Sequence, residues 1–251
     1  MRRCWWLVVI GFWILVSGVE AAPLAVGQVY LDWSRLTVQT FNFSGGSAPS
    51  ITWVKQEEQA EAWADEDYQE NSLPSWGALN VSASMGGASA YASLNSTAME
   101  VYSDPEVVGY SVWSGAHAER FGSFTVSGTG VVSIGVPYTL RVSLGSPSAS
   151  ADAGVSLSLT NVPPGDEFGS GRWSSTGADF WKSGDTDGVG IWTDSGWLWV
   201  SLYFQDGETG YFTATLDTSA SSPVPLPGTL LLLGSGLLGL SLRRRRWFPG
   251  G

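Results

Sequence analysis

Val132 to Leu144 read VSIGVPYTLRVSL, and this stretch decides the fold class of the chain. Every even-numbered position in it is apolar, and the odd-numbered positions are serine, glycine, proline, threonine or arginine. Successive side chains of a β-strand point to opposite faces, so a period of two over 13 residues predicts a strand with one buried face. Pro137 has no N–H to donate to a neighbour, which predicts that the strand lies at a sheet edge or is bulged there.

The same alternation recurs on the C-terminal side of this stretch. After a loop at residues 145–154 it predicts a return strand through Val155, Leu157 and Leu159. A second hairpin is predicted from the runs Leu198–Phe204 and Phe212–Leu216, with a loop at residues 206–208 between them.

A third hairpin is predicted around Gly86 and Gly87. The apolar positions are odd-numbered before these glycines and even-numbered after them. A two-residue turn at Gly86-Gly87 brings all of them to one face, because it pairs Met85 with Ala88, Ala83 with Ala90, Val81 with Ala92 and Leu79 with Leu94.

One stretch does not read as β-structure. Lys55 to Glu66, KQEEQAEAWADE, is rich in helix-forming residues, and seven acidic residues fall between Glu57 and Glu70. Either a short surface helix or an ordered acidic loop is expected there. Several antiparallel hairpins around one core predict an all-β fold, an antiparallel β-sandwich of jelly-roll-like type, at residues 23–222.

The charge of this predicted domain restricts its partners. It contains six basic and 22 acidic residues, a net charge of −16. Such a surface repels phosphate backbones, so no nucleic-acid partner is expected.

The first 22 residues have the features of a secretory signal peptide. Arg2 and Arg3 precede an apolar stretch, and small residues follow it, so cleavage is expected after Ala21 or Ala22. The single cysteine, Cys4, lies before the apolar stretch. The exported chain is therefore expected to contain no disulfide and to suit a bacterial surface.

The last 28 residues, VPLPGTLLLLGSGLLGLSLRRRRWFPGG, carry a three-part pattern. A short motif formed by Val224, Pro225, Leu226, Pro227 and Gly228 leads into an uncharged apolar run at about residues 228–242. The run ends at the cluster Arg243, Arg244, Arg245 and Arg246. An apolar run of this length predicts a transmembrane helix, and the arginines predict a stop that stays in the cytoplasm.

This order of features, at residues 223–251, resembles the PEP-CTERM sorting signal. The resemblance implies processing by exosortase, a membrane-embedded protease or transpeptidase of Gram-negative bacteria, with the chain anchored in the inner membrane beforehand. Leu226 departs from the family pattern, because an acidic residue usually stands between the prolines. Two rival tail signals fit less well: a sortase motif lacks its glycine at Leu230, and a GPI signal lacks its polar spacer.

Two ligand sites are candidates within the domain. Asp185, Asp187 and Asp194 lie close together in sequence and indicate a calcium site, although the EF-hand pattern fails at Val189. Trp197 and Trp199 have the parity opposite to the aliphatic residues around them. They are therefore expected to face away from the core, where indole rings can stack on sugars.

No catalytic motif stands out. His117 is the single histidine, no GxSxG sequence occurs, and carboxylate pairs cannot be identified from spacing. The sequence therefore predicts a non-enzymatic exported protein with no required cofactor. It is expected at the cell surface or in the extracellular matrix, associated with exopolysaccharide or biofilm. The alternative is a carbohydrate-binding module that uses exposed tryptophans, with or without calcium, and a hydrolase is a third, weaker hypothesis.

Overall fold

Alternating apolar and polar residues form thirteen β-strands in the computed structural model, which describes residues 25–43, 45–105, 111–165 and 171–222. The one helical element in these ranges is a single 3-10 turn, η1, at Trp33–Arg35. Within the same ranges, no helix has the length and apolarity needed to cross a membrane. The signal peptide expected at residues 1–22 and the sorting signal expected at residues 223–251, with its span, lie outside the described residues.

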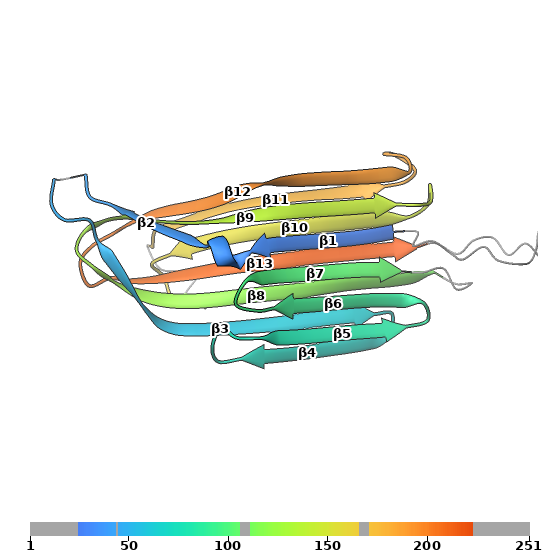
Figure 1. The fold of residues 1–251 in the computed structure, drawn as a ribbon, viewed down its shortest axis with the longest axis horizontal. Helices are drawn as coiled ribbons and strands as arrows, with labels where there is room; N and C mark the ends of the chain where they lie inside the picture. Colours follow the sequence, from blue (N-terminus) through green and yellow to red (C-terminus); the bar gives the residue numbers. More distant parts are fainter. Residues whose placement is uncertain (1–24, 44, 106–110, 166–170, 223–251) are drawn as a thin grey trace, which may run out of the picture.

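The strands form two antiparallel sheets packed face to face (Figure 1). Sheet A contains, in spatial order, β12 (Gly190–Phe204), β9 (Gly130–Leu144), β1 (Ala25–Asp32), β7 (Ala98–Pro105), β6 (Ala88–Leu94) and β5 (Leu79–Met85), with β2 (Thr37–Phe41) also paired to β9. Sheet B contains β11 (Trp173–Ser183), β10 (Ser150–Thr160), β13 (Thr209–Ser222), β8 (Val112–Ser127), β3 (Ser50–Ala64) and β4 (Asp67–Leu73).

The later strands are nested in pairs. β10 pairs with β11 in sheet B, β9 with β12 in sheet A, and β8 with β13 in sheet B. In sequence, β9 and β12 therefore flank the first pair, and β8 and β13 flank the second. β1 completes the set by pairing between β7 and β9. These three nested pairs contain six strands, and with the remaining strands they form two antiparallel sheets. The prediction of an all-β antiparallel sandwich is confirmed.

The hairpin at Gly86-Gly87 is also confirmed. β5 and β6 pair Met85 with Ala88, and the register continues to Leu79 and Leu94 as the sequence predicts. The two glycines have φ values of 60° and 86°. Positive φ at both central residues is the geometry of a type I′ turn, which suits the twist of the flanking strands.

Pro137 is neither in an edge strand nor at a bulge, so that prediction is wrong. β9 is an interior strand, and Pro137 lies opposite Trp197 of β12 in an unbroken register. On the other side, β2 pairs with β9 up to Gly135, and β1 pairs with it from Tyr138 onward. Pro137 therefore lies in the gap between the end of the β2 pairing and the start of the β1 pairing. Proline has no backbone N–H, and in this gap there is no neighbouring strand to which an N–H would donate.

Two of the three predicted hairpins are instead crossings between the sheets. β9 belongs to sheet A and β10 to sheet B, and the same holds for β12 and β13. The loop after β9 is also shorter than expected, because β10 begins at Ser150. The period of two identifies the buried face of each strand, but that face is buried equally whether the chain turns back within one sheet or crosses to the other.

The helix or acidic loop expected at Lys55 to Glu66 is wrong. These residues lie in β3 and in a tight turn to β4, with Asp65 at φ 53°. Ala60, Ala62 and Ala64 are fully buried, and the residues between them, Glu61 and Trp63, face outward. Burial of the alanine face against sheet A outweighs the intrinsic helix propensity of the segment.

The core contains one ion pair inside an aromatic cluster. Trp33 packs edge-to-face on Trp76 at 5.2 Å between ring centroids, and the guanidinium of Arg120 lies 4.8 Å from the Trp33 ring centroid. Arg120 Nε donates to Glu58 Oε2 at 3.0 Å, and Arg120 Nη2 donates to the carbonyl of Asn95 at 2.9 Å. Burial lowers the pKa of Arg120, although the bond to Glu58 opposes that change.

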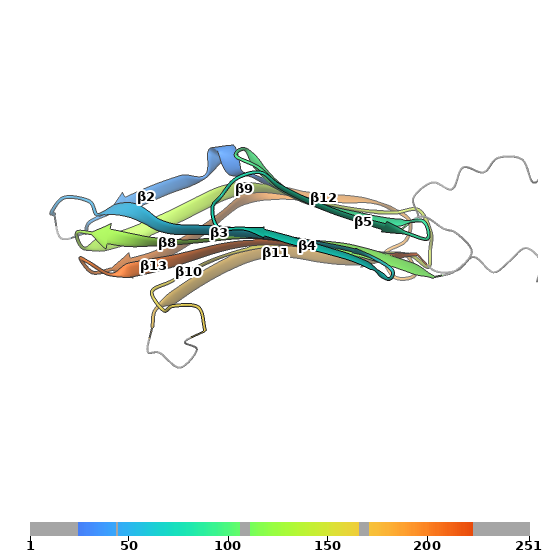
Figure 2. The same cartoon turned by 90° about the horizontal axis from the view of Figure 1, so that it is seen from below.

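The start of the first described strand and the end of the last one lie at the same end of the molecule. β1 begins at Ala25 and β13 ends at Ser222 at the same end of the elongated sandwich, which we call the terminal pole (Figures 1 and 2). The other end, the far pole, contains the turn at Gly128, whose N–H donates to Asp206 Oδ1 at 2.6 Å.

Candidate functional site

Trp197 and Trp199 lie side by side on the outer face of sheet A. The residues that alternate with them, Leu198 and Val200, are buried, whereas the two tryptophans are 41% and 38% exposed. Their ring centroids are 5.5 Å apart and their planes differ by 17°. The orientation expected from their parity is therefore observed, and binding of a ligand there stays a prediction.

The surroundings of this pair fix the rings in place. Arg35, at the end of η1, places its guanidinium 5.0 Å from the ring centroid of Trp197. Gly135 lies directly beneath Trp199, because a Cβ at this position would be 2.4 Å from the indole ring. Pro137 and Gly135 on β9 face the two tryptophans across the ladder. Together these residues hold two stacked indole rings, with the guanidinium of Arg35 over the ring of Trp197.

The structure does not assemble the expected calcium site. Asp187 accepts hydrogen bonds from Lys182 Nζ at 2.9 Å and from the N–H of Ser183 at 3.0 Å, and these bonds lower its pKa, the backbone bond most. Asp194 lies on β12 and accepts from the Tyr138 hydroxyl at 2.8 Å. In the described ranges no group of three or more acidic, histidine or cysteine side chains is placed to hold a metal ion. Asp185, Asp187 and Asp194 therefore do not form one site.

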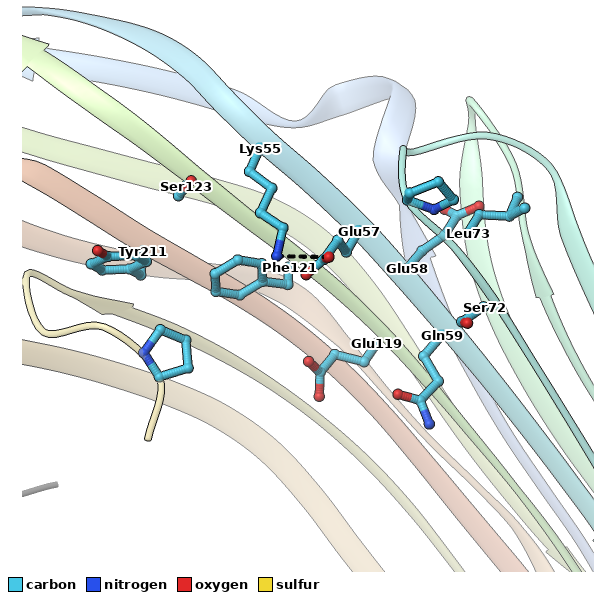
Figure 3. Close-up of a pocket in the computed structure, with 12 residues that line it drawn as sticks. Lys55, Glu57, Glu58, Gln59, Ser72, Leu73, Glu119, Phe121, Ser123 and Tyr211 are labelled. Atoms are coloured by element: carbon cyan, nitrogen blue, oxygen red, sulfur yellow. Dashed lines mark ion pairs between the residues drawn. The ribbon is translucent and has the colours of Figure 1, made fainter. Parts of the chain in front are cut away.

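A hollow lies on the outer face of sheet B (Figure 3). It has a volume of about 620 Å³ and crosses β3, β8 and β13. Phe121 and Tyr211 form its floor, with ring centroids 6.2 Å apart and planes 25° from parallel. Lys55 Nζ lies 5.9 Å from the centroid of Phe121 and forms an ion pair with Glu57 at 2.7 Å.

A second hollow of about 680 Å³ continues the first across β10 to β11. The two share three lining residues, Phe121, Pro164 and Tyr211, so they form one continuous depression, which we call the sheet B groove. Trp173, which is 73% exposed, lies at the β11 end of this groove. Leu73 and Pro74 border one end of the groove, and the described part of the loop between β10 and β11 projects beside the other (Figure 2).

His117 forms a pair with Asp217 on the same outer face. The distance between His117 Nδ1 and Asp217 Oδ1 is 2.7 Å, and this hydrogen bond raises the pKa of the histidine despite partial burial. In the described part of the chain, no serine or threonine hydroxyl is hydrogen-bonded to this ring. The pair joins β8 to β13.

Sequence reasoning did not identify the residues of the sheet B groove. Phe121, Tyr211 and Trp173 are each at outward positions of their strands, but they are far apart in sequence. Tyr211 lies opposite Ser123 on one side and Thr160 on the other, and Thr160 lies opposite Trp173. The outward parity of three aromatic residues was the available signal, but only the strand order shows that they converge.

The comparison with known protein families concerns the tail. Residues 223–246 match the PEP-CTERM protein-sorting motif, a range that includes the segment Val224–Gly228 and the cluster Arg243–Arg246. No curated protein matches the chain significantly. The chain thus carries a PEP-CTERM sorting signal. This signal supports an exported protein that exosortase processes, membrane-anchored before processing and at the surface afterwards.

Proposed function

We propose that this chain is a non-enzymatic protein of a Gram-negative cell surface or extracellular matrix, where it associates with exopolysaccharide. An exosortase-like protease would release it from the inner membrane after export. The signal peptide at residues 1–22 would start this route, and the tail at residues 223–251 would complete it. The observation that carries the proposal is the sorting motif at residues 223–246.

The shape of the domain supports this role. The tail follows Ser222, the last residue of β13, which lies at the terminal pole. The far pole and both outer faces therefore lie away from the attachment point. A domain presented in this way can contact matrix polymers over its length.

Intact-mass measurement of protein recovered from cells and matrix tests the proposed processing. The mature chain is expected to start at Ala22 or Pro23 and to end between Ser222 and Pro227. Retention of Trp247 to Gly251 in most of the surface-exposed protein would contradict processing by exosortase and would leave a plain C-terminal anchor.

A second candidate is a carbohydrate-binding module that uses Trp197 and Trp199. The observation in its favour is the stacked, half-exposed pair of indole rings, held by Gly135 beneath one ring and by Arg35 over the other. The apolar face of a sugar ring packs well on such a surface. Calcium is not required by this version of the hypothesis.

A further inference from the structure

The sheet B groove has the dimensions of a site for an extended polymer. It crosses five adjacent strands, β3, β8, β13, β10 and β11, which at 4.8 Å per strand spacing corresponds to about 19 Å. The two hollows that compose it have volumes of about 620 and 680 Å³ and share their central residues. A shallow, continuous depression of this kind fits a chain lying across it better than a small compact ligand.

The floor of the groove offers aromatic rings at both its centre and its end. Phe121 and Tyr211 lie stacked in the middle, and Trp173 stands at the β11 end. Between them the lining combines hydroxyl residues, such as Ser158 and Thr213, with apolar residues of the loop after β10, Val162, Pro163 and Pro164. Aromatic and apolar surfaces interspersed with hydroxyl groups suit a ligand whose own apolar faces alternate with hydroxyl groups.

The polar groups of the groove restrict the charge of the ligand. Glu57 is paired with Lys55, so the ammonium group is already neutralised. Glu119 belongs to no ion pair within the described residues, and it lies beside Gln59 in the groove lining (Figure 3). An acidic polymer would be repelled by Glu119 and by a domain of net charge −16, whereas the carboxylates and the amide can accept hydrogen bonds from hydroxyl groups.

We propose that the sheet B groove binds internal stretches of a neutral, hydroxyl-rich polysaccharide. Phe121, Tyr211 and Trp173 pack against the apolar faces of sugar rings, and Glu57, Gln59 and Glu119 bond their hydroxyls. The proposal rests on the matrix role given above and names the class of polymer for that role. The site is separate from Trp197 and Trp199, which lie on the other sheet.

Affinity electrophoresis of the full chain tests this site, in native gels with a non-ionic detergent. The gels contain a neutral glucan, a galactomannan or, as the acidic comparison, polygalacturonate. The wild-type chain is expected to be retarded by at least one neutral polymer and not by polygalacturonate. Trp173→Ala is expected to weaken this binding roughly threefold to tenfold, the loss that corresponds to one aromatic contact.

Trp181→Ala is the matched control. Trp181 lies on the same strand and the same outer face and is 60% exposed, but it is eight residues from Trp173, about 26 Å along β11, and does not line the groove. It is expected to leave the retardation unchanged. Both tryptophans are on the surface, so neither variant should unfold the domain, and circular dichroism checks that they do not.

Three outcomes would overturn the proposal: no retardation by any neutral polymer, stronger retardation by polygalacturonate, or equal weakening by Trp173→Ala and Trp181→Ala. The mass of the chain recovered from cells and matrix is measured in parallel. Normal tail removal together with absent polymer binding would refute the groove alone, whereas a retained tail would refute the sorting route.

Discussion

Arg120 illustrates how one charged residue can be held inside an aromatic core. Its side chain is 1% exposed and its ion pair with Glu58 is completed by backbone carbonyls. Removal of one partner leaves the other charge buried and unpaired, so Glu58→Met and Arg120→Met are each expected to lower the free energy of unfolding by about 3–5 kcal/mol. The double variant Glu58→Met/Arg120→Met is expected to lose less than the sum of the two.

Urea unfolding of the four proteins measures this coupling, with Glu57→Gln as the control. Glu57 is adjacent in sequence but pairs with Lys55 at the surface, so its loss should change stability by less than about 1 kcal/mol. Additive losses in the double variant would mean that the two buried charges are independent.

The turn at Gly86 gives a second prediction at the scale of one residue. Gly86 has φ 60°, a conformation that valine adopts only with strain, so Gly86→Val is expected to destabilise the domain by about 1–3 kcal/mol. Gly154→Ala is the control, because its φ is not positive and a Cβ there would meet its nearest neighbour, on Asp179, at an ordinary 3.6 Å. Equal decreases of the denaturation midpoint in both variants, relative to the wild-type protein, would argue against strain at the turn.

The His117–Asp217 pair predicts a pH dependence of stability. Asp217 raises the pKa of His117 above its ordinary value of 6.5, chiefly through the hydrogen bond. A raised pKa in the folded state means that the pair stabilises fully below pH 6.5 and loses this contribution as pH rises through the folded-state pKa. Asp217→Asn should therefore lower the unfolding midpoint more at mildly acidic pH than above neutrality. A difference between wild type and variant that is constant with pH would contradict this.

At the scale of the element, the sequence identified strands better than it identified their partners. The period of two in β9, β10, β12 and β13 was visible because their inward residues are large aliphatic or aromatic side chains. β3 was missed because its buried face over Ala60 to Ala64 is alanine alone, and alanine between glutamates also favours a helix. Local propensity therefore failed where burial is supplied by small residues.

Pairing between distant strands lies beyond the reach of these patterns. The hairpin at Gly86-Gly87 was predictable because the turn residues adjoin both strands. The crossings from β9 to β10 and from β12 to β13 depend on which sheet has room for the next strand, which is a property of the whole fold. For the same reason Trp197 and Trp199, neighbours on one strand, were found from sequence, and the groove residues from three strands were not.

The tryptophan pair on β12 predicts a separation of binding from folding. Both rings are on the outer face, so Trp197→Ala and Trp199→Ala should leave the unfolding transition nearly unchanged. Retention on the native exopolysaccharide should decrease if these rings contact sugars. Gly135→Ala offers a further variant, because its Cβ would displace the ring of Trp199 without removing it. Unfolding by both tryptophan variants would assign the pair to packing.

At the scale of the whole molecule, the sandwich places the two proposed ligand surfaces away from the end at which the tail is attached. Ala25 and Ser222 share the terminal pole, while the sheet B groove and the tryptophan pair occupy the two outer faces. If both bind polymer as proposed, their positions allow them to do so at once. Many copies released into one matrix would bind polymers with an avidity above that of a single site. Weak binding in each groove is thus compatible with firm retention.

The last prediction concerns the route by which this molecule reaches the surface. Arg243 to Arg246 form the end of the sorting motif, and a cluster of arginines next to an apolar span resists translocation. Replacing all four by serine should let the tail pass through the membrane before it is processed. The expected result is a chain that retains residues 223–251 and appears in the medium, detected by mass measurement. Replacement by four lysines keeps the charge and should preserve processing. Normal tail removal in the serine variant would mean that the proline motif and span suffice for recognition.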